Sequence, residues 1–452
     1  MCIYRNLLCG LAVWAMVAGS FPGLAQQSRE VSIDGLIYDL DHPDGDRRKA
    51  AAKLLGQHKA VQAAPGLIEL TEDPDPSIRM AALRALVWLN DLSALDTYVR
   101  LTHDSRQEIQ EKAIEGIINI YIVEEGGFIT TLKKFVESVN PFSDDYNPLV
   151  VEPFVPVSQD ANQALTELLT WHIPQIRKDA AIALGILRGR SALPVMQATL
   201  SRETSDSVKV ELIRAFYKIG DPAAGRALIP SIMDPDKKVH DEAIFALGRL
   251  RVNEAAPQMK QLYESGVQER RKVLGLVPVS GSDDLQKKLL EALAYIGDPS
   301  CRELFLNALT DPRESYRLYA AEGLGRIGDT SYLTEVGRQY LREDSGKVKL
   351  ALNYSLYNLG REEHLIELVG NLDSDQVYYY LLELDAGEVP KLYPYLRESD
   401  HSIRMRLLDI VGLRGDPSAF PIIQEMAGSP NAELASAANL ALRRIEGRST
   451  SD

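Results

Sequence analysis

A glycine-rich stretch is the most recognisable catalytic pattern in this chain of 452 residues. Residues Gly323–Gly328 read Gly-Leu-Gly-Arg-Ile-Gly, which matches the spacing of a dinucleotide-binding fingerprint. That fingerprint needs a strand before it and a helix that begins at it, whereas this stretch ends an amphipathic helical pattern. No Gly-x-Ser-x-Gly or Ser-x-x-Lys motif occurs in the sequence either. We therefore predict no catalytic residue and no cofactor.

Tyrosine is the other chemically versatile residue that is unusually concentrated. Eleven of the nineteen tyrosines lie between residues 316 and 395. Tyrosine offers a rigid apolar ring with a polar tip and is enriched at protein interfaces. The concentration favours a protein-binding face, and the alternative is that the rings fill gaps between packed helices.

The elements that carry these residues repeat along the chain. In Asp311–Asp329, apolar residues occur at offsets 0, +4, +8 and +11, which form one stripe on a helix. Gly328 then follows as a helix C-cap. Upstream, Pro299–Leu309 is a second amphipathic pattern with proline in its first turn. The unit is therefore a helix A and a helix B joined by tight turns.

The helix-B stripe recurs at a nearly fixed period. Six of the steps between successive stripe starts are 31 or 32 residues. Nine full stripes begin at Ile78, Ile109, Ile176, Val208, Val239, Leu285, Tyr316, Val348 and Leu434, and three degraded ones begin at Arg47, Val377 and Ile403. Such self-similarity is typical of a stacked solenoid, in which each pair needs its neighbours to bury its apolar face. The predicted fold is an all-α solenoid of about twelve helix pairs.

An acidic residue often lies six positions before a basic residue at the start of helix B. The pairs are Asp73/Arg79, Glu203/Lys209, Asp234/His240, Asp311/Arg317, Glu343/Lys349 and Glu398/Arg404. This pattern, the segment Asp73–Leu86 and the Gly-Asp-Pro turns resemble the HEAT-repeat family over roughly residues 31–446. The resemblance implies that turn acids and helix-B bases form a ladder between stacked repeats. It implies little about activity, because a fold does not fix a function.

Some tyrosines are expected to point away from the core stripe, which centres near 35° on the helical wheel. Tyr319 and Tyr380, at offset +3, lie about 95° from that centre, and Tyr354 and Tyr357 lie about 145–155° away. We predict that these four residues bind a partner and that Tyr316, in the stripe, is buried.

Two families of enzymes are built from similar helical repeats. The deoxyhypusine hydroxylases resemble this architecture and hold iron through His-Glu pairs, but none of the seven histidines here is followed by glutamate. The nearest approaches are His103-Asp104 and His240-Asp241, so no metal site is predicted. Phycobilin-lyase-like proteins resemble the short helix pairs of this chain. The export signal that we expect at the N-terminus, described below, argues against that activity.

Two stretches interrupt the period. Residues 123–158 contain four prolines and several apolar side chains, so a packed segment with a functional rim is expected. Its candidate partner-binding residues are Phe142, Tyr146 and Phe154. Residues 266–280 lie inside repeat seven, and they form either a basic, apolar contact loop or an extension of the helices.

The two ends are expected to lie outside the fold. Residues 1–25 combine Arg5, a short apolar run and Ala25, which is typical of a secretory signal peptide, and an uncleaved anchor is the alternative. Repeats 1–3 then occupy residues 26–122, repeats 4–12 occupy 159–446, and residues 447–452 are an expected disordered tail. Loss of Arg5 leaves 49 basic and 64 acidic residues, a charge of −15. That balance disfavours nucleic acid and anionic membranes, and no membrane span is expected after cleavage.

The leading interpretation is an exported, periplasmic or secreted scaffold that binds another protein on its concave helix-B surface. A metal-dependent or lyase-like enzyme is the second hypothesis, and a structural component of an envelope assembly is the third. Cys301 would be the one cysteine left after cleavage, and a half-buried or buried structural role is expected for it.

Overall fold

The computed structural model describes residues 32–122, 149–152, 154–273 and 280–449, without the side chains of residues 267–282. Within these ranges the protein consists of twelve helix pairs and contains no strand, as the period predicts. Repeats one to three are α1 (Ile33–Asp39) with α2 (Gly45–Gln57), α3 (Ala64–Leu70) with α4 (Pro76–Leu89), and α5 (Leu95–Leu101) with α6 (Gln107–Ile122). Repeats four to six are α8 (Gln159–Leu168) with α9 (Pro174–Ile186), α10 (Leu193–Leu200) with α11 (Asp206–Ile219), and α12 (Pro222–Gly225), continued by a 3₁₀ helix over Arg226–Met233, with α13 (Lys237–Arg249).

The remaining six pairs follow the same order. Repeats seven to nine are α14 (Ala256–Val273) with α15 (Ser280–Ile296), α16 (Arg302–Ala308) with α17 (Glu314–Ile327), and α18 (Leu333–Arg342) with α19 (Gly346–Asn358). Repeats ten to twelve are α20 (His364–Gly370) with α21 (Asp375–Leu382), α22 (Tyr395–Glu398) with α23 (His401–Arg414), and α24 (Phe420–Ala427) with α25 (Ala432–Ser449). One turn of 3₁₀ helix precedes most first helices.

Each second helix is buried on two sides. One side is the predicted stripe, with Ile78, Ala82 and Leu86 at most 3% exposed. The other side packs on the next second helix, and a glycine nine residues after the stripe start permits the close approach. A Cβ atom there would lie only 2.7–3.0 Å from the next helix's Cα, in the pairs Gly56–Ala85, Gly185–Ala215, Gly248–Ala292, Gly325–Ser355 and Gly412–Ala441. Helix–helix contact, and not nucleotide binding, therefore explains Gly325 of the glycine-rich stretch.

The ion-pair ladder joins consecutive repeats, as the resemblance implies. In five repeats the basic residue at the start of the second helix reaches the turn acid of the following repeat, whereas His240 pairs with Asp241 and Arg404 donates to backbone carbonyls. The pairs are Arg48–Asp73, Arg79–Asp104, Arg177–Glu203, Lys209–Asp234 and Arg317–Glu343, at 2.7–2.9 Å. Arg317 also donates to the carbonyl oxygen of Asp311 in its own turn, at 2.9 Å. The hydrogen bond from Arg317 lowers the pKa of Glu343 to about 2, so this rung is fully ionised near neutral pH.

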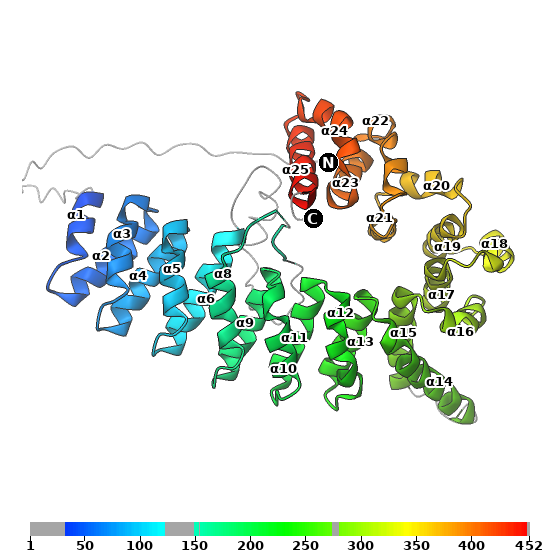
Figure 1. Ribbon diagram of the computed structural model, residues 1–452, viewed down its shortest axis with the longest axis horizontal. Helices are drawn as coiled ribbons and strands as arrows, with labels where there is room; N and C mark the ends of the chain where they lie inside the picture. The colour runs from blue at the N-terminus through cyan, green and yellow to red at the C-terminus, as the bar shows by residue number, and fades with distance from the viewer. Residues whose placement is uncertain (1–31, 123–148, 153, 274–279, 450–452) are drawn as a thin grey trace, which may run out of the picture.

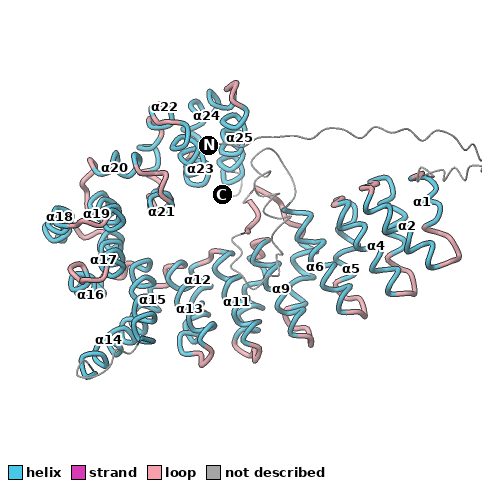
Figure 2. Tube along the Cα trace, turned by 180° about the vertical axis from the view of Figure 1, so that it is seen from behind, coloured by secondary structure: helices cyan, strands magenta, loops and turns pink. Residues whose placement is uncertain are grey.

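The solenoid curves back on itself (Figure 1). Helices α1 to α13 follow one another in a row, the chain turns through α15, α17 and α19, and α21 to α25 return above the row. Around the bend, the second helices α17, α19, α21 and α23 lie on the inner side, and α16, α18, α20 and α22 lie outside (Figure 2). The inner side of the curve is thus the helix-B surface.

The structure describes most of residues 266–280 and the first three residues of the expected C-terminal tail. The second interruption is a helix extension in its described part, because α14 continues to Val273 and α15 begins at Ser280. The expectation of a disordered tail from residue 447 is wrong for residues 447–449, which belong to α25. Arg448 in this last turn donates to the carbonyl oxygens of Gly412 and Gly415, at 2.5 and 2.6 Å, and so extends the helix against α23.

Candidate functional site

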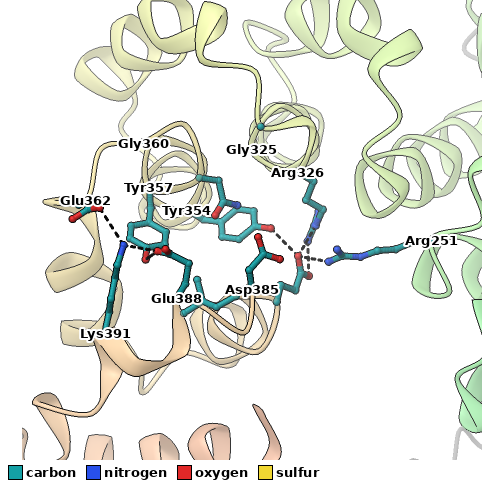
Figure 3. Close-up of a pocket in the computed structure, with 14 residues that line it drawn as sticks. Arg251, Gly325, Arg326, Tyr354, Tyr357, Gly360, Glu362, Asp385, Glu388 and Lys391 are labelled. Atoms are coloured by element: carbon teal, nitrogen blue, oxygen red, sulfur yellow. Dashed lines mark hydrogen bonds and ion pairs between the residues drawn. The ribbon is translucent and has the colours of Figure 1, made fainter. Parts of the chain in front are cut away.

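The carboxylate of Glu383, which follows α21, receives contacts from three other repeats, and Figure 3 shows the contributing side chains Arg251, Arg326 and Tyr354. Arg326 of α17 donates two hydrogen bonds to Glu383, from Nε at 2.8 Å and from Nη2 at 3.0 Å. Arg251, just after α13, lies 2.7 Å away, and the Tyr354 hydroxyl of α19 donates at 2.7 Å. We call Arg251, Arg326, Tyr354 and Glu383 the hub. Because these residues come from repeats six, eight, nine and ten, the hub fixes the bend of the solenoid.

The hub continues into a buried second layer. Glu322, 5% exposed, accepts a hydrogen bond from the Tyr380 hydroxyl at 2.5 Å and pairs with Arg326 at 3.1 Å. The rings of Tyr354 and Tyr380 stack with centroids 4.3 Å apart. Burial raises the pKa of Glu322 although Arg326 opposes this effect. Burial acts in the same direction on Glu383, but there Arg326 and Arg251 outweigh it and hold the pKa below its ordinary value.

A cavity of about 390 Å³ opens beside the hub. Its lining includes three cationic side chains, Arg251, Arg326 and Lys391, and four carboxylates, Glu362, Glu383, Asp385 and Glu388. The Tyr357 hydroxyl donates to Glu388 at 2.5 Å, and Lys391 bridges Glu388 and Glu362 at 2.7 and 3.1 Å. Asp385 is exposed, and its carboxylate has no polar partner among the described residues. The cavity is thus lined mainly by charge and by tyrosine hydroxyls, which suits polar groups of a ligand.

The predicted exposure of the tyrosines is wrong at three positions. Tyr354, Tyr357 and Tyr380 are 3%, 5% and 2% exposed. The helical wheel measured their distance from one buried stripe, whereas each second helix also packs on its neighbours and the bend brings α21 close to α17. Tyr354 and Tyr357 nevertheless line the cavity. Tyr319 is half-buried and donates to Glu291 at 3.0 Å.

Tyr316 and Tyr379 differ sharply in exposure. Tyr316 is 2% exposed, so its predicted burial is confirmed. Tyr379 of α21 is 52% exposed and was not among the predicted binding residues. Its offset of +2 from Val377 places it about 165° from the stripe centre, so the same wheel would have found it.

The first interruption joins distant repeats where it is described. Its residues Phe142 and Tyr146 lie outside the described residues. Phe154 is half-buried against α25, where a Cβ on Gly447 would lie 2.5 Å from the Phe154 Cβ. The neighbouring Glu152 receives two hydrogen bonds from Arg444 of α25, at 2.9 and 2.6 Å, and the Val151 amide donates to the Ile186 carbonyl at 2.9 Å. Residues 149–152 thus connect α9 to the last repeat, as expected for a packed segment.

Metal and thiol chemistry depend on the histidine, cysteine and carboxylate side chains. Across residues 32–122, 149–152, 154–273 and 280–449, no group of three histidine, cysteine, aspartate or glutamate side chains is arranged to hold a metal ion. Cys301 is fully buried, and burial raises the pKa of its thiol to about 11, as expected for a structural cysteine. None of the helices described is long and apolar enough to cross a membrane.

Comparison with known proteins agrees with the ladder and the repeat period. A family model described as HEAT repeats matches residues 33–118 and 275–357. These two regions of the chain are HEAT repeats. The chain is also similar to the bilin biosynthesis protein PecE of Mastigocladus laminosus, with 33% identity over 91 residues. That match covers 20% of this chain and 34% of the relative, so the chain spans about a third of the relative's length.

Two solved structures are similar to this chain at low sequence identity. A crystal structure of an engineered protein is 18% identical, and the match covers 92% of this chain and 98% of the engineered protein, with a TM-score of 0.42. The complex of CpcE and CpcF of phycocyanin lyase from Nostoc sp. PCC7120 is 16% identical and covers 76% and 100%, with a TM-score of 0.30.

Proposed function

We propose that this HEAT-repeat protein is an exported scaffold that binds another protein on the inner, helix-B surface of its curve. The observation that carries this proposal is the hub, in which Glu383 ties Arg251, Arg326 and Tyr354 of three other repeats together. These contacts hold the inner surface in one shape before any partner arrives. A preorganised surface binds with a smaller loss of conformational entropy than a mobile one.

The inner surface at the bend also presents the kind of side chain that protein interfaces favour. Tyr379 is 52% exposed, and its ring lies 6.0 Å from the Arg249 guanidinium of α13. Tyrosine and arginine are the residues most often found at the centre of binding interfaces. The bend between α13 and α21 is therefore the part of the inner surface where we expect a partner to contact the scaffold.

The experiment compares an inner with an outer exposed residue. Full-length protein carrying Tyr379→Ser would be immobilised beside wild type and beside Leu341→Ser, a change at an 85% exposed residue of the outer helix α18. We expect wild type and Leu341→Ser to capture the same protein from a crosslinked native envelope fraction, and Tyr379→Ser to lose most of it. Equal capture by all three, or capture lost with Leu341→Ser, would argue against binding at the inner bend.

A second candidate function rests on the PecE match. The 91 residues shared with this bilin biosynthesis protein favour a lyase-like role in bilin chemistry. The test is to mix the purified chain with a free bilin and with a bilin-binding protein, and to follow the absorption spectrum. A pigment that becomes covalently attached faster with the chain present would establish this role and displace the scaffold proposal.

A further inference from the structure

One position of helix B carries a basic residue in four repeats. It lies ten residues after the stripe start and is occupied by Lys218 in α11, Arg249 in α13, Arg326 in α17 and Arg444 in α25. We call these the tenth-position cations. In α11 and α25 the side chain at this position passes over the glycine of the preceding helix B. The Lys218 Cδ would lie 3.3 Å from a Cβ on Gly185, and the Arg444 Cδ would lie 3.4 Å from one on Gly412. The aliphatic parts of Lys218 and Arg444 are therefore held by packing against the neighbouring helix B.

Two of the four cations bind a carboxylate that comes from a distant part of the chain. Arg326 holds Glu383, two repeats later, with two hydrogen bonds. Arg444 holds Glu152, which is 292 positions away and lies in a non-helical segment, again with two hydrogen bonds. Paired hydrogen bonds of this kind are the strongest form of arginine–carboxylate contact. The tenth position is thus built to receive a carboxylate from outside its own repeat.

The other two cations have no such partner in the part of the chain that the structure describes. Lys218 and Arg249 donate no hydrogen bond and form no ion pair with any described residue. Glu211, the carboxylate that most influences Lys218, instead pairs with Arg214 at 2.8 Å. Lys218 is half-buried, and this burial lowers the pKa of its ammonium group to about 8. The Arg249 Nε is buried without an acceptor.

Arg249 is nevertheless held in place by aromatic rings. Its guanidinium carbon lies 3.9 Å from the centroid of Tyr295, 5.3 Å from Phe245 and 6.0 Å from Tyr379. Rings fix a guanidinium by cation–π attraction but leave its N–H groups without acceptors. An external carboxylate binds most favourably to a cation that is already fixed and partly desolvated. Folding has then already supplied the free energy needed to remove water from the cation and to order its side chain.

Lys218 and Arg249 occupy the same position in consecutive repeats, so the distance between neighbouring repeats sets the distance between the two acidic groups of a ligand. Packed helices lie roughly 8–10 Å apart. An extended peptide rises about 3.3 Å per residue, so three residues span about one repeat. The chain as a whole is acidic, with a net charge of −14. Lys218 and Arg249, which form no ion pair with a described residue, therefore make a locally positive site that favours an acidic ligand.

We propose that Lys218 and Arg249 bind two carboxylates, three residues apart, in an extended acidic segment of the partner protein. The segment would run across α11 and α13 toward the exposed ring of Tyr379. This inference rests on the proposed scaffold function and specifies the chemistry of the partner.

The test uses fluorescence anisotropy with three synthetic peptides of 15 residues. The first has glutamate at every third position among serine and threonine, the second has glutamine in place of each glutamate, and the third has the same number of glutamates in one block. The full-length protein is compared as wild type, as the double variant Lys218→Gln with Arg249→Gln, and as Arg338→Gln. Arg338 is an exposed residue of the outer helix α18, and its substitution controls for the loss of a positive charge away from the inner surface. Circular dichroism would verify that each variant is folded.

We expect wild type and Arg338→Gln to bind the evenly spaced peptide at least tenfold more tightly than either other peptide, with affinity that falls as salt rises. The double variant should lose about tenfold or more in affinity for that peptide. No binding by wild type, equal binding of the spaced and block peptides, or unchanged binding by the double variant would overturn the inference. If the double variant still captures the native partner while Tyr379→Ser does not, this inference fails and the scaffold function stands.

Discussion

Arg444 in the last helix holds Glu152, which precedes the fourth repeat, by two hydrogen bonds at 2.6 and 2.9 Å. The same guanidinium reaches Asp409 of α23 at 2.5 Å. A solenoid whose repeats touch only their neighbours would leave its two ends independent. Here the contact closes repeats four to twelve into a loop, so the last repeat is stabilised by a segment at the other end of that loop.

This contact predicts the effect of Arg444→Gln. The substitution removes three charge-assisted hydrogen bonds from two partly buried carboxylates, and we expect the last repeat to lose about 1.5–3 kcal/mol of stability. Amide hydrogen exchange in α25 should become faster, and the radius of gyration in solution should rise. Arg397→Gln, which breaks a pair with Glu425 in which both side chains are more than 60% exposed, is the control and should change neither quantity. Unaltered exchange in α25 of the Arg444 variant would contradict the closed loop.

The hub predicts which tyrosines the fold needs. Tyr354→Ala should destabilise the C-terminal repeats by about 3–5 kcal/mol, because a fully packed ring is lost. Tyr354→Phe should cost about 1–2 kcal/mol, because Glu383 loses one donor and keeps Arg326 and Arg251. Tyr379→Ala, at an exposed ring, should stay within about 1 kcal/mol. Urea unfolding followed by circular dichroism measures all three, and equal effects of the two alanine substitutions would show that the hub does not hold the bend.

These tyrosines also show which features of the fold can be predicted from the sequence. The repeat period and the stripe predict twelve helix pairs, because both depend on contacts between residues close in the sequence. The burial of Tyr354 depends instead on Tyr380 and Arg326, which reach it from neighbouring repeats. Their meeting is determined by a small rotation at every repeat, and the apolar pattern of one helix does not encode that rotation.

The sequence did not predict the Arg444–Glu152 contact or the hub, for a related reason. Arg444 and Glu152 are ordinary charged residues in the sequence, and only the accumulated curvature brings them together across 292 positions. The ladder, by contrast, joins residues 25 or 26 positions apart, such as Arg79 and Asp104, so its existence could be inferred from the repeat itself.

A buried carboxylate in α9 makes stability depend on pH. Asp179 is 2% exposed, and burial, assisted by the charge of Glu111, raises its pKa to about 7. The folded protein then keeps this proton up to about pH 7, whereas the unfolded chain releases it near pH 4. Folding is therefore progressively disfavoured as the pH rises from about 4 to 7, by roughly 2–4 kcal/mol.

The substitution Asp179→Asn should remove this pH dependence. Asparagine keeps an oxygen that can accept the hydrogen bond from Gln175 Nε2, at 2.8 Å in the native protein. We expect the variant to have a higher urea midpoint than wild type at pH 8 and a similar midpoint at pH 4. Parallel midpoints for the two proteins from pH 4 to pH 8 would mean that Asp179 is ionised in the fold.

Export predicts a defined N-terminus. If residues 1–25 are a signal peptide, protein recovered from outside the cytoplasm should begin at Gln26. Substitution of Ala25 by a bulky residue such as tyrosine should slow the cleavage and leave a longer form attached to the membrane. N-terminal sequencing of both proteins makes the measurement, and wild-type protein that begins at Met1 would contradict cleavage.

The central claim is that a partner protein occupies the inner surface at the bend. A photo-crosslinking phenylalanine analogue placed at Tyr379, and separately at Leu341 on the outer helix α18, tests it in cells. Both positions are exposed, so neither change should unfold the protein. Illumination should join a single additional protein to the Tyr379 variant and none to the Leu341 variant. Crosslinks from Leu341 alone, or from neither position, would contradict binding on the inner surface.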